Sequence, residues 1–75
     1  MLVKIQYDTA SEFADWSTPY GVIETSFRSL GTGRLWGVAM QGGKVVIDYF
    51  PRLNHERIAR AAYGVLAARE AHNHE

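Results

Sequence analysis

A pair of adjacent glycines, Gly42-Gly43, constrains the fold of this sequence more than any other feature. The glycines separate residues 34–41 from residues 44–50, and both segments are rich in β-branched and aromatic side chains. Glycine enters the positive-φ conformations of two-residue turns without steric cost, so the pattern predicts a β-hairpin. The pairs expected across it are Gln41 with Lys44, Met40 with Val45, Val38 with Ile47, and Trp36 with Tyr49. We expect the face that carries the last three pairs to be the core.

A third strand precedes this hairpin in the sequence. Residues 22–29 alternate, with Ile23, Thr25 and Phe27 on one face. A four-residue loop at 30–33 would continue the chain into the hairpin. The pairs then expected are Phe27 with Trp36, Thr25 with Val38, and Ile23 with Met40. The sequence therefore predicts a three-stranded meander whose core includes Trp36 and Ile47.

The N-terminal third predicts a strand and a short helix. Residues 2–7 alternate in the period of a half-buried strand. Thr9 and Glu12 have the spacing of a capping box, which predicts a short helix over residues 10–16. Pro19 would end this segment, because proline disfavours a helical conformation in the residue before it.

The C-terminal third predicts one long helix. Asn54 is a good N-cap, and the alanine-rich segment from residue 55 to about 71 has high helix propensity. Its apolar face comprises Ile58, Ala62, Val65 and Leu66, and should cover the sheet. We therefore expect a single α+β domain over residues 1–75. It would be a small single-layer antiparallel sheet packed on the long helix, in the order strand, short helix, three strands, long helix.

Charge and composition narrow the classes of function. The 75 residues carry eight basic and eight acidic side chains, so the formal net charge is zero, and there is no cysteine. The charge is asymmetric: residues 1–24 sum to −3 and residues 25–60 to +4. Absence of cysteine excludes disulfides and thiolate metal sites. No secretion signal or long apolar run is recognisable, so we expect a cytoplasmic protein without membrane association.

No residue pattern typical of catalysis is present. His72, His74 and Glu75 are candidate ligands for a divalent metal. The two histidines are two residues apart in a polar tail that offers no third rigid ligand, so we expect no metal site. His55 could act as an acid or base near neutral pH, although an exposed histidine without a role is the simpler interpretation. Residues 31–33 lack the rest of a phosphate-binding loop and indicate a turn. We expect neither enzymatic activity nor a cofactor.

From the short helix onward, the predicted order of elements resembles that of double-stranded-RNA-binding domains, as does the alanine-rich last helix. Those domains carry lysines at the start of that helix, where this chain has Asn54-His55-Glu56-Arg57. The resemblance implies nucleic-acid binding as an alternative function. The basic residues available for it are Arg28, Arg34, Lys44, Arg52, Arg57 and Arg60, and the aromatic residues that could stack on bases are Phe27, Trp36 and Tyr49.

Two candidate binding surfaces follow from the predicted register. The sheet face away from the helix would show Leu35, Val46 and Phe50 among charged residues, which is the composition of an interface. The outer side of the helix would show a strip of small residues that includes Gly64 and is flanked by Arg57 and Arg60. The predicted partner-binding residues are Arg28, Leu35, Lys44, Val46, Phe50, Arg57, Arg60 and Gly64.

The function predicted from these surfaces is that of a non-enzymatic protein-binding module. The partner is another protein or, as a homodimer, a second copy of the chain. Phages and mobile elements encode small folds of this kind as inhibitors of host machinery, including CRISPR effectors, so an anti-CRISPR-like inhibitor is the expected type. Nucleic-acid binding is the alternative, and the zero net charge disfavours it.

Overall fold

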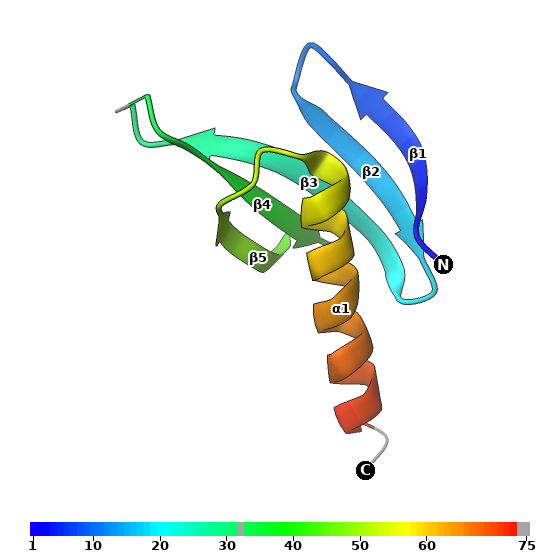
Figure 1. Cartoon of the computed structure of the whole chain (residues 1–75). Coiled ribbons are helices and arrows are strands. Elements are labelled where there is room, and N and C mark those ends of the chain that lie inside the picture. The colour runs from blue at the N-terminus through cyan, green and yellow to red at the C-terminus, as the bar shows by residue number, and fades with distance from the viewer. Residues whose placement is uncertain (32, 74–75) are drawn as a thin grey trace.

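The computed structural model describes residues 1–31 and 33–73, which form five strands followed by one helix (Figure 1). The strands make one antiparallel sheet in chain order. The α+β class is therefore confirmed, whereas the predicted order of elements is wrong. The elements are β1 (Val3–Asp8), β2 (Phe13–Thr18), β3 (Gly21–Ser29), β4 (Leu35–Gln41), β5 (Lys44–Phe50) and α1 (His55–Asn73).

The predicted short helix is replaced by a tight turn and strand β2. The Asp8 carboxylate accepts hydrogen bonds from the backbone N–H of Ala10 and Ser11, at 2.9 and 3.4 Å, and Glu12 adopts a φ of 52°. This local capping reverses the chain before a helix can begin. β2 then pairs with β1 on one side and with β3 on the other. The element order shared with double-stranded-RNA-binding domains is therefore absent.

The long helix begins as predicted at Asn54. The Asn54 side-chain oxygen accepts the Arg57 N–H at 3.1 Å, and its carbonyl accepts the Ile58 N–H at 3.0 Å. This N-cap satisfies groups that the first helical turn would otherwise leave unpaired. The side of α1 that is buried comprises Ile58, Ala59, Ala62 and Leu66.

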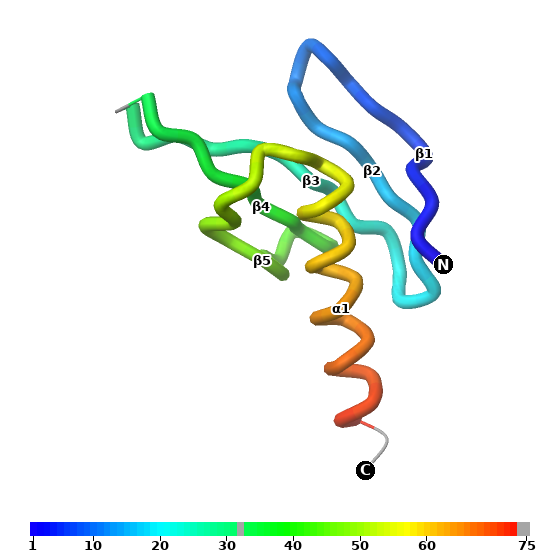
Figure 2. Tube along the Cα trace, in the orientation of Figure 1, coloured from blue at the N-terminus to red at the C-terminus, as the bar shows by residue number. Residues whose placement is uncertain are grey.

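α1 covers one face of the sheet, and its C-terminal half extends beyond the strands (Figures 1 and 2). Ile23 of β3 and Ala39 of β4 pack with Ile58, Ala62 and Leu66. A neighbouring cluster joins Ala14, Trp16 and Ala59. Both clusters lie between α1 and this face, and Val38 of β4 is buried on the other side of the sheet. α1 lacks the apolar length that a membrane-spanning helix requires.

The predicted β3–β4 register is wrong by one residue. Phe27 lies opposite Gly37, and Thr25 lies opposite Ala39. Five residues separate the two strands, one more than predicted, and this extra residue turns β4 over. The helix imposes the same choice, because a Cβ atom on Gly37 would lie 2.5 Å from the Ile58 side chain. Gly37 and Ala39 therefore face α1, whereas Trp36, Val38 and Met40 face away.

The β4–β5 register agrees with the prediction only near the turn. Gln41 pairs with Lys44, Met40 pairs with Val45, and both turn glycines have positive φ. Two irregularities then place two additional residues in β5, so that Ala39 pairs with Ile47 and Gly37 with Phe50. The consequences are that Val46 and Phe50 pack against the core beside α1, whereas Tyr49, predicted to be core, is 69% exposed. Ile47 is half-buried against the core.

Candidate functional site: the outer face of the sheet

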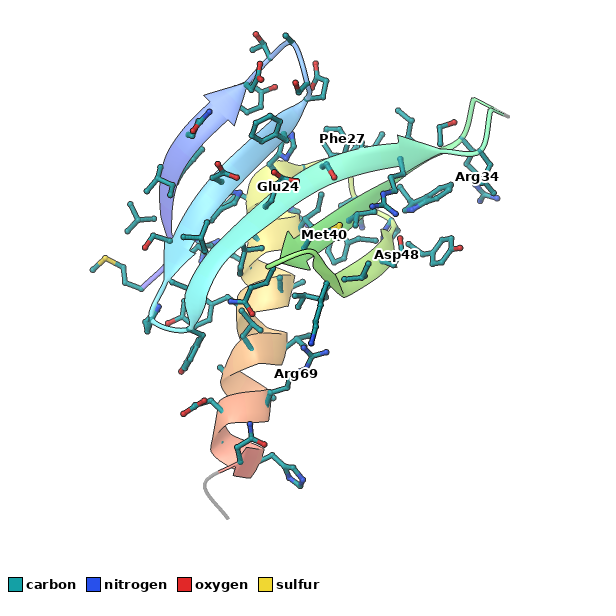
Figure 3. The ribbon with its side chains drawn as sticks, turned by 180° about the vertical axis from the view of Figure 1, so that it is seen from behind. Glu24, Phe27, Arg34, Met40, Asp48 and Arg69 are labelled. Atoms are coloured by element: carbon teal, nitrogen blue, oxygen red, sulfur yellow. The ribbon has the colours of Figure 1, made fainter. Side chains whose placement is uncertain are left out.

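The face of the sheet opposite α1, here called the outer face, is the first candidate site (Figure 3). Alternate residues of β3 face α1, so the intervening residues and their cross-strand partners face outward. Among the described residues α1 is the only helix, and it packs on the opposite side. The outer face comprises Phe13, Asp15, Ser17, Val22, Glu24, Ser26, Arg28, Trp36, Val38, Met40 and Val45, of which Val38 is fully buried.

One end of the outer face carries a stacked pair of aromatic rings, Trp36 and Tyr49. Their centroids lie 5.1 Å apart with an interplanar angle of 29°. Asp48 fixes both residues, because one of its carboxylate oxygens accepts the Trp36 indole N–H at 2.9 Å and the Tyr49 backbone N–H at 2.8 Å. Tyr49 has a φ of 56°, in the left-handed region that disfavours a bulky side chain. The fold thus holds an exposed tyrosine in a costly conformation, as binding sites often do.

A hollow of about 400 Å³ adjoins the two rings. Arg34, Leu35 and Pro51 line it together with Trp36 and Tyr49, and we call these five residues the aromatic patch. Arg34 is the last residue of the loop that joins β3 to β4 (Figure 3). Arg28 lies opposite Trp36 in the sheet, and its guanidinium contacts the Met40 sulfur at 3.3 Å. This end of the outer face is therefore aromatic and basic.

The other end of the outer face is acidic. Asp15 and Glu24 are paired across β2 and β3, and both line a smaller hollow of about 290 Å³ that includes Val22 and Met40. Glu24 and Arg28 are four residues apart on one strand, or about 13 Å at the rise of a β-strand. The asymmetry of charge along the sequence thus reappears as opposite charges at the two ends of one surface.

The predicted partner-binding residues separate into three groups. Arg28 lies on the outer face opposite Trp36, and Leu35, on the other side of β4 by register, lines the hollow beside Trp36. Val46 and Phe50, predicted to face outward, are partly buried and pack against the core. The remaining four are exposed elsewhere: Lys44 follows the β4–β5 turn, and Arg57, Arg60 and Gly64 lie on α1, where Arg60 pairs with Glu56 at 3.4 Å.

Sequence reasoning missed Trp36 and Tyr49 as surface residues because it assigned both to the core. An aromatic residue in a small sheet usually packs inward. Here the one additional residue in the β3–β4 loop turned Trp36 to the outer face. The available signal was the glycine at position 37, since a glycine within a strand often marks a place where another element approaches closely.

A second candidate site centres on His55 in the first turn of α1. Its Nδ1 atom lies 2.8 Å from the Thr25 hydroxyl, which also accepts the Trp16 indole N–H at 3.0 Å and approaches the Ala14 carbonyl at 3.3 Å. All partners are satisfied if Thr25 donates to Ala14 and His55 donates from Nδ1. The Nε2 atom then carries a lone pair, and it is buried without a partner in the described part of the chain.

The Thr25 and His55 pair has the separation of a nucleophile and a base, but its surroundings are those of a structural network. Thr25 is 0% exposed, and Trp16 and Ala14 occupy its hydroxyl group. A nucleophile must reach the atom that it attacks. We therefore interpret this network as a tether that fixes the start of α1 against β2 and β3.

This tether predicts a dependence of stability on pH. Burial lowers the pKa of His55 below its ordinary value of 6.5 and outweighs Glu12, which raises it, while Lys4 adds to the lowering. The Tyr7 ring also faces the imidazole, at 5.5 Å. Because His55 binds a proton more readily in the unfolded chain than in the folded one, the contribution of neutral His55 to stability is fully present above pH 6.5. This contribution is lost as the pH falls from 6.5 through the lowered pKa of His55.

The melting temperature should therefore fall between about pH 7 and pH 5, and it should fall less in His55→Asn. His72→Asn, at the exposed end of α1, is the matched control. Thermal melts of all three proteins across this range measure the effect. Equal declines in His55→Asn and the wild type would contradict this account of the network.

Metal binding has no support from the described residues. In residues 1–31 and 33–73, no three His, Cys, Asp or Glu side chains lie together as a metal site requires. His74 and Glu75, two members of the tail set considered in the sequence, lie outside the described residues.

Comparison of the chain with protein-family models, curated protein sequences and solved structures finds no match. The assignment of function therefore depends on the chemistry of the surfaces described above.

Proposed function

We propose that this chain is a non-enzymatic protein-binding module that uses the aromatic end of its outer face. The observation that carries the proposal is the stacked pair of Trp36, which is partly buried, and Tyr49, which is 69% exposed, on the sheet face opposite α1. Tryptophan, tyrosine and arginine are the residues most enriched at the energetic centres of protein interfaces. All three meet at this end, where Arg34 lines the hollow beside the rings.

Rigidity favours this end as a binding surface. The hydrogen bonds from Trp36 and Tyr49 to one Asp48 oxygen restrain both aromatic residues before any partner arrives. A side chain that is already ordered loses less conformational entropy on binding. The adjoining hollow offers an apolar floor, from Leu35 and Pro51, for an anchoring side chain of the partner.

The charges specify the kind of partner. Arg28 and Arg34 are the basic residues at this end, and the Asp48 carboxylate already accepts two hydrogen bonds within the domain. A complementary segment would therefore be acidic and would carry an aromatic, aliphatic or proline residue for the hollow. We propose such a segment of another protein as the partner. An inhibitor of host machinery, of the anti-CRISPR-like kind that phages encode, remains the proposed biological role.

Selection from a displayed library of random peptides tests the proposal. Peptides that bind the wild-type domain should be enriched in Asp and Glu around one apolar or aromatic residue. Trp36→Ala should lose them, whereas Arg60→Glu, on the outer side of α1, should retain them. Binding peptides without acidic residues, or peptides lost with Arg60→Glu and kept with Trp36→Ala, would contradict the proposal.

Single-stranded nucleic acid is the second candidate, because a base could stack on the exposed Tyr49 ring while arginines contact phosphate. A fluorescent oligothymidine probe distinguishes the two functions. The zero net charge predicts weak binding that disappears near 150 mM salt, roughly the physiological ionic strength. Tight binding at that salt concentration, lost in Tyr49→Gly, would favour nucleic acid as the ligand.

A further inference from the structure

We propose that β1 pairs with β1 of a second copy of the chain, so that two five-stranded sheets join into one continuous antiparallel sheet. β1 is an edge strand, and its hydrogen-bonded neighbour in the sheet is β2. An edge strand presents unpaired backbone groups that can hydrogen-bond to another strand. The pairing would involve neither the aromatic patch nor the partner proposed for it.

The surroundings of β1 leave it open to such pairing. α1 packs against β2, β3, β4 and β5, so β1 joins the fold mainly through β2 (Figures 1 and 2). Every residue of β1 except Asp8 is exposed. Three of them are large apolar or aromatic side chains, Val3, Ile5 and Tyr7, with 44%, 55% and 44% of their surface exposed.

The opposite edge of the sheet is protected by comparison. β5 begins with Lys44, contains two register irregularities and a positive φ at Tyr49, and is followed by Pro51. Charge, irregular backbone and proline are the features by which natural sheets prevent pairing at an edge. β1 carries one basic residue, Lys4, and one irregularity, between Lys4 and Gln6, but has neither a proline nor a positive φ. Of the two edges, β1 is therefore the one suited to pairing.

The charges of β1 identify a second copy as its complement. Its basic residue, Lys4, and its acidic residue, Asp8, lie near opposite ends of the strand. Two-fold antiparallel pairing centred on Gln6 places Lys4 opposite the second copy's Asp8 twice, and Ile5 opposite Tyr7 twice. Opposite charges, and aromatic with β-branched residues, are stabilising cross-strand pairs. A parallel arrangement in register would instead place like charges together.

Sedimentation velocity over a range of protein concentrations tests this inference. The wild type should pass from monomer to dimer as the concentration rises. Lys4→Glu replaces two attractive pairs by two repulsive ones and should raise the dimer dissociation constant about tenfold or more. Lys44→Glu makes the same change of charge at the other edge and should leave the constant unchanged. Asp8 is unsuitable for this test, because its carboxylate holds the β1–β2 turn.

Hydrogen exchange gives a second readout that does not depend on a variant. Backbone amides of β1 should be more protected at high than at low protein concentration, while amides of β5 should not change. A domain that remains monomeric at every concentration would overturn the inference. It would also be overturned by a dimer that responds equally to Lys4→Glu and Lys44→Glu, with β1 amides unprotected.

Discussion

Replacing Gly37 with valine should lower the free energy of unfolding by about 1–3 kcal/mol. A Cβ atom at this position would lie 2.5 Å from Cδ1 and 2.7 Å from Cγ1 of Ile58, and 3.2 Å from the Phe50 Cβ atom. Ile58 is fully buried, so it has little room to move away. The loss is large for a domain of 75 residues, whose total stability is about 4–11 kcal/mol at the usual values per residue.

Chemical denaturation of the wild type and Gly37→Val measures this loss. Gly64→Ala is the matched control, because Gly64 is exposed on α1 and a Cβ atom there would meet nothing within 4 Å. The control should gain up to about 1 kcal/mol from better helix propensity. A Gly37→Val protein as stable as the wild type would show that α1 does not pack on β4 at this position.

Replacing Tyr49 with glycine should remove partner binding while leaving the stability of the domain nearly unchanged. Glycine adopts the φ of 56° without strain, which relieves a cost of about 1–3 kcal/mol. Loss of the stacking on Trp36, about 0.5–1.5 kcal/mol, and the greater flexibility of glycine offset that gain. The net change in unfolding free energy should stay within about 1 kcal/mol.

The effect of Tyr49→Gly on affinity should be much larger. A tyrosine at the energetic centre of an interface contributes about 2 kcal/mol or more, so the dissociation constant of a selected peptide should rise about 30-fold. Titration calorimetry measures the affinity, and a thermal melt of the same sample measures the stability. An unchanged affinity of Tyr49→Gly would show that Tyr49 is not part of the interface. If Tyr49→Gly does not fold, the affinity of Trp36→Ala tests the aromatic end instead.

The elements with strong local signals were predictable from the sequence. Gly42-Gly43 defined the β4–β5 turn, Asn54 defined the start of α1, and alternation over residues 22–29 defined β3 with its buried face. Each of these signals depends on residues that are close together in the chain. The α+β class followed from them.

The direction of β4 was not predictable from the same reasoning, because it depends on parity. One additional residue in the β3–β4 loop moves every side chain of β4 to the opposite face of the sheet, and the loop sequence does not show at which residue β4 begins. The close approach of α1 to Gly37 is a tertiary contact that local pattern cannot show. The error moved Trp36 and Tyr49 to the core, and so concealed the aromatic end of the outer face.

The predicted short helix was wrong for a different reason. Thr9 and Glu12 have capping-box spacing, which would use their own backbone N–H groups. Instead, the Asp8 carboxylate accepts the N–H groups of Ala10 and Ser11 and closes a turn. Phe13 and Trp16 are three residues apart, so in a helix they would lie on one side. In strand β2 they face opposite sides of the sheet. Pairing with β1 and β3 decided in favour of the strand.

The central claim is that the outer face, and not the outer side of α1, binds the partner. The most direct measurement is a ¹⁵N–¹H NMR titration of the domain with a peptide selected by display. We expect the largest shift changes at the Trp36 indole N–H and at the backbone amides of Leu35 and Tyr49. Changes confined to Arg57, Arg60 and Gly64, with the Trp36 indole signal unmoved, would contradict it.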